Sequence, residues 1–155
     1  MRLRRPRPDA PAARALAIAG NNLAAALEEM RDRGAAETVA MIAAAEIGLR
    51  YWRIAGTWLE EERAHYQLAR SLVAAGRAAD AAKAARDCLD VCRANAAPPF
   101  EAFFGHTVLA LARRAQGETT AYEAARAAAL AAYAQIADDE RSWCAADLAA
   151  LDVKP

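Results

Sequence analysis

Apolar side chains recur every three or four positions over most of this 155-residue chain, as they do along one face of an α-helix. The stripe between about residues 36 and 54 consists of Thr38, Ile42, Ala45, Leu49 and Trp52. Similar stripes at about 9–32, 58–75 and 78–94, and three more after residue 99, predict about seven helices. No segment shows the alternation of β-branched residues that is typical of a strand. We therefore expect an all-α fold.

Residues that can begin a helix stand before several of these stripes. Thr57 and Glu60 have the spacing of a capping box, in which each side chain bonds the backbone N–H of the other residue. The other candidate N-cap residues are Asp9, Thr119 or Thr120, and Asp138. Prolines in the segment NAAPP, residues 95–99, separate the fourth predicted helix from the fifth.

Three glycines divide the chain at nearly equal intervals. Gly34, Gly76 and Gly117 are 42 and 41 residues apart. A period of this length is typical of stacked helical hairpins, and glycine is favoured where the first helix of a hairpin ends. The spacing therefore predicts antiparallel hairpins that each bend at a glycine.

Composition narrows the class of protein. Hydrophobic residues make up 56% of the chain, but aromatic residues make up only 6%. Much of the remaining hydrophobic share is alanine, the best helix former. Twenty basic and twenty acidic residues give a formal net charge of zero, so the overall charge favours neither nucleic acid nor an anionic membrane as a partner. No apolar run has the length of a membrane-spanning helix. We expect a cytoplasmic protein, with a flexible basic arm at residues 1–8 and one helical domain at 9–155.

The third and fourth predicted helices resemble the tetratricopeptide repeat (TPR), a helix–turn–helix unit of many protein-binding proteins. The residues that carry this resemblance are His65, Leu68, Ala69 and Leu72 before Gly76, and Ala81 and Cys88 after it. The next unit matches in part, with His106, Leu109 and Ala110 before Gly117, and Ala129 after it. The resemblance spans residues 58–136 and implies a short, right-handed, TPR-like solenoid of stacked hairpins with a concave groove.

In that family, the groove is lined by the first helix of each unit. The matching positions here are Arg63, Tyr66, Arg70 and Val73 in one unit, and Phe104, Thr107, Leu111 and Arg114 in the next. A more divergent unit at about 20–55 adds Asn21 and Glu28. Because arginine and aromatic residues often anchor protein contacts, we expect a non-catalytic adaptor without a cofactor. Its partner would be a protein or peptide, through an acidic or amphipathic segment.

The cysteines and histidines allow a second interpretation. Cys88 and Cys92 lie one helical turn apart, and His65 and His106 are 41 residues apart, the interval of the repeat. We interpret the cysteines as buried packing residues that stay reduced, and the histidines as packing residues at equivalent repeat positions. The alternative is a metal- or thiol-dependent binding protein that uses Cys88, Cys92 and a histidine, with Cys144 as a further ligand candidate. A homodimer formed through the first helix is another alternative.

Overall fold

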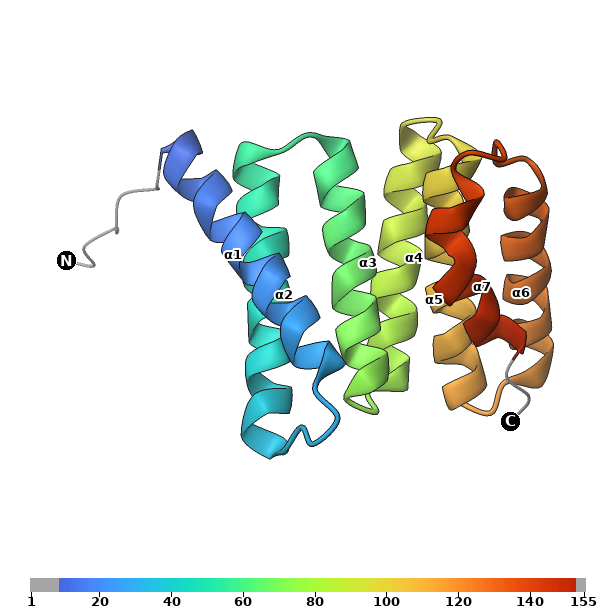
Figure 1. The fold of residues 1–155 in the computed structure, drawn as a ribbon, viewed down its shortest axis with the longest axis horizontal. Coiled ribbons are helices and arrows are strands. Elements are labelled where there is room, and N and C mark those ends of the chain that lie inside the picture. Colours follow the sequence, from blue (N-terminus) through green and yellow to red (C-terminus); the bar gives the residue numbers. More distant parts are fainter. Residues whose placement is uncertain (1–8, 153–155) are drawn as a thin grey trace.

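The computed structural model describes residues 9–152, and this part of the chain is helical throughout, without strands. The helices are α1 (Ala10–Glu29), α2 (Ala35–Ala55), α3 (Trp58–Ala74), α4 (Ala78–Ala94), α5 (Pro99–Ala115), α6 (Thr119–Ala134), the short 3-10 helix η1 (Arg141–Cys144) and α7 (Ala145–Asp152) (Figure 1). The predicted all-α class is confirmed. The predicted basic arm at residues 1–8 lies outside the described residues.

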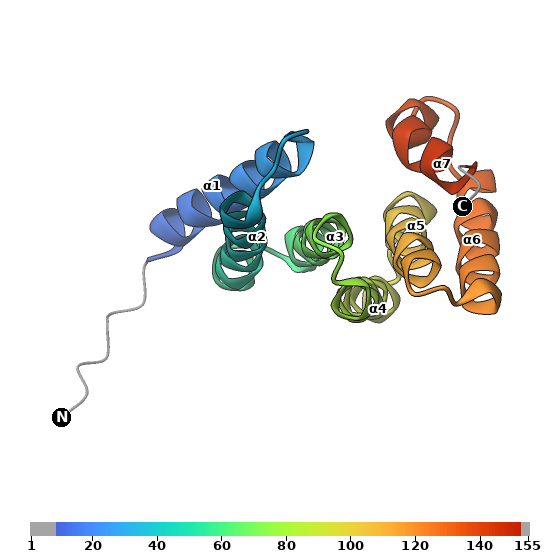
Figure 2. The same cartoon turned by 90° about the horizontal axis from the view of Figure 1, so that it is seen from below.

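The first six helices pair as three antiparallel hairpins, α1–α2, α3–α4 and α5–α6 (Figure 1). Viewed along the helices, they follow an arc, with α1 and α7 above its two ends and α3 and α5 between them (Figure 2). Direct contacts join α1 to α3, α3 to α5, and α5 to α7. These four helices therefore form the inner side of the arc.

The second and third hairpins bend in the same way. Gly76 and Gly117 have φ angles of +74° and +72°, in the left-handed region that glycine adopts without steric cost. After α3, the N–H of Gly76 bonds the carbonyl of Val73, and the N–H of Arg77 bonds that of Leu72. The same pair of bonds follows α5, so both helices end in a Schellman motif. The predicted glycine bends are confirmed at these two positions.

The first hairpin bends differently, and here the prediction is wrong. Gly34 has a φ of −86° and is the N-cap of α2, where its N–H donates to the Glu37 carboxylate at 3.0 Å. The guanidinium of Arg33 takes over the end of α1, donating to the carbonyls of Leu27 and Glu28, both at 3.0 Å. A charged side chain thus satisfies the last carbonyls of α1.

Two glycines allow α1 and α2 to cross at very close range. A Cβ on Gly20 would lie 2.7 Å from the Ala44 carbonyl oxygen, and one on Gly48 would lie 2.0 Å from Oδ1 of Asn21. Asn21 therefore faces α2. Asn21 is not among the residues that line the pockets on the inner side of the arc.

Two of the four predicted helix N-caps are present. Asp9 caps α1 by accepting from the N–H of Ala12 at 2.9 Å, and the capping box at the start of α3 is present. In contrast, α6 begins at Thr119 after Glu118, so neither threonine is its N-cap. Asp138 precedes η1 by three residues and pairs with Arg141 at 3.1 Å instead of capping a helix.

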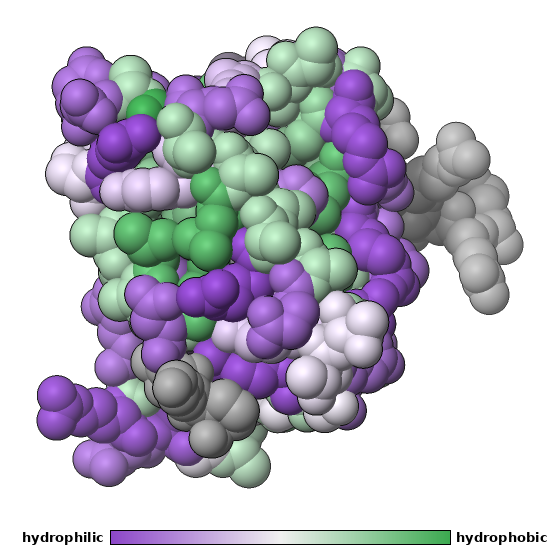
Figure 3. Space-filling view, turned by 90° about the vertical axis from the view of Figure 1, so that its right-hand side faces the viewer, coloured by the Kyte–Doolittle hydropathy of each residue, from purple (hydrophilic) through white to green (hydrophobic). Residues whose placement is uncertain are grey.

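The last helix folds back onto the third hairpin. Leu151 of α7 and Cys144 of η1 are buried in one cluster with Phe103 of α5, Ala129 of α6 and Ile136, which follows α6. At this end of the molecule, hydrophobic residues gather near the middle of the surface, with hydrophilic residues on either side of them (Figure 3). Among the described residues, no helix combines the length and the apolar character that crossing a membrane requires.

Candidate functional site

The inner side of the arc carries a set of side chains that we call the inner face. Its members are Glu28 of α1, Arg63, Tyr66, Arg70 and Val73 of α3, Phe104 and Leu111 of α5, and Asp147 of α7. The four residues from α3 are spaced three or four apart, so they follow one stripe of that helix. Six of the eight residues predicted to line the groove are members.

The remaining two predicted groove residues occupy other places. Thr107 has an exposed fraction of 0%, and its hydroxyl donates to the Phe103 carbonyl one turn earlier at 2.9 Å. It faces the protein interior, so this prediction is wrong. Arg114 donates to the Ala150 carbonyl of α7 at 3.1 Å and lies over the ring of Tyr122. It belongs to the contact between α5 and α7.

At one end of the inner face, Arg63 holds Glu101 of α5. Its Nε and terminal nitrogen donate to the two carboxylate oxygens at 3.1 and 2.5 Å, a bidentate arrangement. Burial acts to raise the pKa of Glu101, but hydrogen bonds from Arg63 and Glu62 outweigh it and the pKa is lowered. Glu101 is therefore ionised, and it balances the charge of Arg63.

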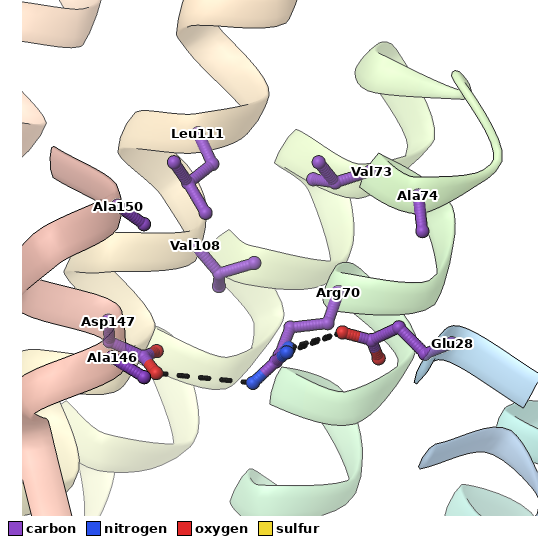
Figure 4. Close-up of a pocket in the computed structure, with 9 residues that line it drawn as sticks. All are labelled: Glu28, Arg70, Val73, Ala74, Val108, Leu111, Ala146, Asp147 and Ala150. Carbon is purple, nitrogen blue, oxygen red and sulfur yellow. Dashed lines mark hydrogen bonds and ion pairs between the residues drawn. The ribbon is translucent and has the colours of Figure 1, made fainter. Parts of the chain in front are cut away.

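In the middle of the inner face, Arg70 connects three helices. It donates from Nε to Glu28 of α1 at 2.7 Å, and its outer nitrogen lies 4.0 Å from Asp147 of α7 (Figure 4). Tyr66 donates its hydroxyl proton to Asp147 and accepts from Arg70 at 3.2 Å. Burial and the Asp147 charge raise the pKa of Tyr66, so the hydroxyl stays protonated. This network of Glu28, Tyr66, Arg70 and Asp147 joins α1 and α7 to α3.

Beside this network is a pocket of about 200 Å³, which we call the inner pocket (Figure 4). Its lining is mostly apolar and comes from three helices: Val73 and Ala74 of α3, Val108 and Leu111 of α5, and Ala146 and Ala150 of α7. Its polar members are Glu28, Arg70 and Asp147, and both carboxylates approach the Arg70 guanidinium. The inner pocket thus offers an apolar floor and charged groups along one edge.

A second pocket of about 210 Å³, the aromatic pocket, lies between α3 and α5. It is lined by Glu62, Arg63, Tyr66, Phe100, Glu101 and Phe104. The Phe104 ring packs edge-on against Tyr66 and Phe100, with ring centres 5.5 and 5.1 Å apart. Tyr66 is close to both pockets, because its ring lines one and its hydroxyl belongs to the network at the edge of the other.

Behind the inner face, toward α4, the structure brings Cys88 and Cys92 together with Glu62, and we call these three residues the thiol cluster. Their exposed fractions are 0%, 3% and 1%. The two sulfurs lie 3.3 and 3.6 Å from Oε2 of Glu62, as thiols donating to a carboxyl oxygen. All three cysteines of the chain are free.

Neither histidine belongs to the thiol cluster, so the predicted combination of two cysteines and a histidine is not what the fold assembles. His65 lies 3.3 Å from Arg53 and 3.7 Å from Glu61, and burial followed by the Arg53 charge lowers its pKa. His106 and Cys92 line a common surface pocket between α4 and α5, but the His106 imidazole is not part of the thiol cluster.

Glu62 of the thiol cluster has an unusual pKa for a glutamate. Burial, followed by a hydrogen bond to Glu101, raises the pKa of Glu62 from 4.5 to about 10. A hydrogen bond to Cys92 and burial raise the pKa of the Cys88 thiol. Without a bound cation, the cluster therefore holds a neutral Glu62 at neutral pH.

Sequence reasoning missed Asp147, Glu101 and Glu62. Asp147 is 81 residues from its partner Tyr66, and no periodic signal shows that the last helix returns to the inner face.

A search for a matching family profile finds none, and searches of curated proteins and of solved structures also find no match. The resemblance to the tetratricopeptide repeat therefore stays a prediction based on the residues given above.

Proposed function

We propose that this protein is a non-catalytic, TPR-like adaptor that binds an amphipathic helical segment of a partner protein on its inner face. The observation that carries the proposal is the inner pocket, a cavity to which three helices contribute apolar side chains. Leu111 lines this pocket and takes no part in the buried clusters of the fold. An apolar side chain that stays at the surface beside a pocket is typical of a recognition site.

The arrangement of hairpins supports the TPR-like part of the proposal. The first helix of each hairpin, α1, α3 or α5, lies on the inner side of the arc, as in the family that the sequence resembles (Figure 2). The identical turns at Gly76 and Gly117 are consistent with repetition of one unit. We propose a right-handed solenoid that includes the more divergent first hairpin. A cytoplasmic location is consistent with three free thiols.

The charges of the inner face favour an amphipathic segment over an acidic one. Glu28 and Asp147 both approach Arg70, and Glu101 neutralises Arg63. An acidic ligand would have to displace one of these carboxylates before it could pair with an arginine. In contrast, an apolar side chain can enter the inner pocket without breaking any ion pair, and a basic residue beside it would meet Glu28 or Asp147 at the edge.

Selection from a displayed random peptide library, with peptides long enough for several helical turns, tests this proposal. We expect the purified chain to enrich sequences with apolar residues at intervals of three and four, followed by a basic residue. The diagnostic variant is Leu111→Glu, which places a charge in the pocket floor. It should weaken binding of the selected peptides by at least about tenfold.

The matched control is Val39→Glu on α2, which introduces the same charge at a position that is 69% exposed. It should bind the peptides as the unaltered chain does, and circular dichroism should show that both variants keep their helices. Equal binding by the Leu111→Glu variant would show that the inner pocket is not the recognition surface. Enrichment of acidic peptides whose binding is lost on combined Arg63→Glu and Arg70→Glu substitution would replace the amphipathic partner with an acidic one.

A further inference from the structure

The three ligand atoms of the thiol cluster have the spacing of a tetrahedral metal site. The two cysteine sulfurs lie 3.3 and 3.6 Å from Oε2 of Glu62, and all three atoms lie within 4.8 Å of one another. With Zn–S bonds of about 2.3 Å and Zn–O bonds of about 2.0–2.2 Å, tetrahedral angles place sulfur and oxygen about 3.5 Å apart. Both sulfur–oxygen separations are close to this value, so they match the spacing that a Zn²⁺ ion bound by these atoms requires.

Rigid elements hold these ligands. Cys88 and Cys92 lie one turn apart on α4, and Glu62 lies in the second turn of α3, which packs along α4. On the far side of Cys88, Gly105 of α5 allows a close approach, since a Cβ there would lie 3.3 Å from the Cys88 sulfur. Sites built on packed helices keep their ligands in place better than sites on loops.

The Glu62 carboxyl is also poorly compensated for its burial. Its residue is 1% exposed, and Arg63, whose Nε lies 3.9 Å from Oε1, makes its two hydrogen bonds to Glu101 instead. Burial of an ionised carboxylate is costly, and binding of a cation next to it would offset that cost.

The cluster lies between two openings at the surface. Glu62 lines the aromatic pocket on the inner side, and Cys92 lines the pocket of about 270 Å³ between α4 and α5. Each opening thus borders one of the three ligand residues.

We propose that Glu62, Cys88 and Cys92 form a binding site for Zn²⁺, with three protein ligands and one position open to water or to an incoming group. Two thiolates select a soft or borderline ion, which excludes Mg²⁺ and Ca²⁺, and the carboxylate favours Zn²⁺ over Cu⁺. The site is separate from the peptide-binding inner pocket, so the two proposals can fail independently.

Titration of the full chain with Co²⁺, and then displacement by Zn²⁺, tests the site. The chain is purified under reducing conditions without a histidine tag and is freed of metal by chelation. We expect one Co²⁺ per chain, with thiolate-to-cobalt charge-transfer absorption and the visible bands of a tetrahedral ion. Added Zn²⁺ should abolish these bands and raise the melting temperature.

Three variants assign the ligands. Cys92→Ala should weaken Co²⁺ binding by at least about 100-fold, and Glu62→Gln by at least about tenfold, with the charge-transfer band retained in the glutamine variant. Cys144→Ala is the matched control, because Cys144 is also free and buried but lies outside the cluster. It should bind the ion as the unaltered chain does.

Absence of the cobalt bands, or binding that survives Cys92→Ala in a chain that circular dichroism shows to be folded, would overturn the proposal. So would loss of binding in the Cys144→Ala variant, or binding of Cu⁺ with no binding of Co²⁺ or Zn²⁺. Because alanine is a good helix former, the Cys92→Ala substitution in α4 leaves the helix itself intact.

Discussion

Helix α3 presents polar side chains toward the inner face and toward α4, and the two sets differ in how their charges are balanced. On the inner face, Arg63 pairs with Glu101 at 2.5 Å and Arg70 pairs with Glu28 at 2.5 Å. Toward α4, Glu62 is 1% exposed and its neighbours are two thiols. Neighbouring residues of one helix are thus in opposite electrostatic situations.

The difference shows what each side can do. Pairing keeps the inner-face groups ionised, and because the partners come from α1, α5 and α7, it fixes the positions of helices that line the pockets. Burial, followed by the hydrogen bond to Glu101, keeps Glu62 neutral, and loss of its proton would make its carboxylate available to a cation. The first arrangement favours binding of a neutral or apolar group, and the second favours a metal ion.

Glu62→Gln should have the largest effect on stability, measured in metal-free protein. The folded-state pKa of Glu62 is raised to about 10, so stability is greatest below the ordinary value of 4.5 and falls as the pH rises toward 10. Glutamine does not titrate and lacks this loss. From pH 5 to pH 8, we expect the free energy of unfolding of the variant, relative to the unaltered chain, to increase by about 1–3 kcal/mol in urea titrations.

Glu123→Gln is the control for this prediction, because it makes the same chemical change at an exposed position on α6. Its difference from the unaltered chain should stay nearly constant over the same pH range. A constant difference for Glu62→Gln as well would contradict the neutral, buried carboxyl.

Tyr66→Phe tests the network on the other side of α3. It removes the hydrogen bond to Asp147 and should lower the free energy of unfolding by about 1–2 kcal/mol, since the acceptor is a carboxylate. This bond joins α7 to α3. Relative to the unaltered chain, hydrogen–deuterium exchange of the variant should therefore become faster in α7, with a smaller change in α4. Tyr51→Phe on α2 is the control, and unchanged exchange in α7 would show that the bond does not hold that helix.

Much of the fold could be predicted because its signals are local. The helical period, the capping box at Thr57 and Glu60, and the glycines at positions 76 and 117 each act within a few residues, and the helices begin and end close to the predicted positions. The glycine bend predicted at Gly34 is wrong because the Arg33 side chain bonds the last carbonyl groups of α1 instead. The period of 41–42 residues alone does not distinguish these two turns.

The site was less predictable because its contacts join distant segments. Tyr66 and Arg70 were expected to face a partner, but Asp147 and Glu28 occupy their polar groups. Glu62 could be read as a favourable charge in the first turns of α3, and only the packing of α3 on α4 places it beside two cysteines. Whether a residue of the predicted groove stripe stays accessible depends on its neighbours, as the complete burial of Thr107 shows.

Arg63→Lys should have a smaller effect than Tyr66→Phe. Lysine keeps the positive charge but cannot form two parallel hydrogen bonds to Glu101, which arginine does at 3.1 and 2.5 Å. We expect a loss of about 0.5–1 kcal/mol in the free energy of unfolding, and a larger loss for Arg63→Ala, which leaves the buried Glu101 without its cation. Equal losses for the two variants in urea titrations would contradict a contribution from the charge itself.

Lys83→Ala should have the smallest effect, because it breaks an ion pair that belongs to neither side of α3. Lys83 and Asp87 lie 2.8 Å apart, one turn apart on α4, but their side chains are 70% and 38% exposed. Water and salt screen such a pair, so we expect a loss below about 0.5 kcal/mol that disappears at high ionic strength. If Lys83→Ala lowers the free energy of unfolding as much as Arg63→Lys does, the distance between the charges alone determines the energy of an ion pair. If its effect is negligible, the larger effect at Arg63 comes from burial of its carboxylate partner, Glu101.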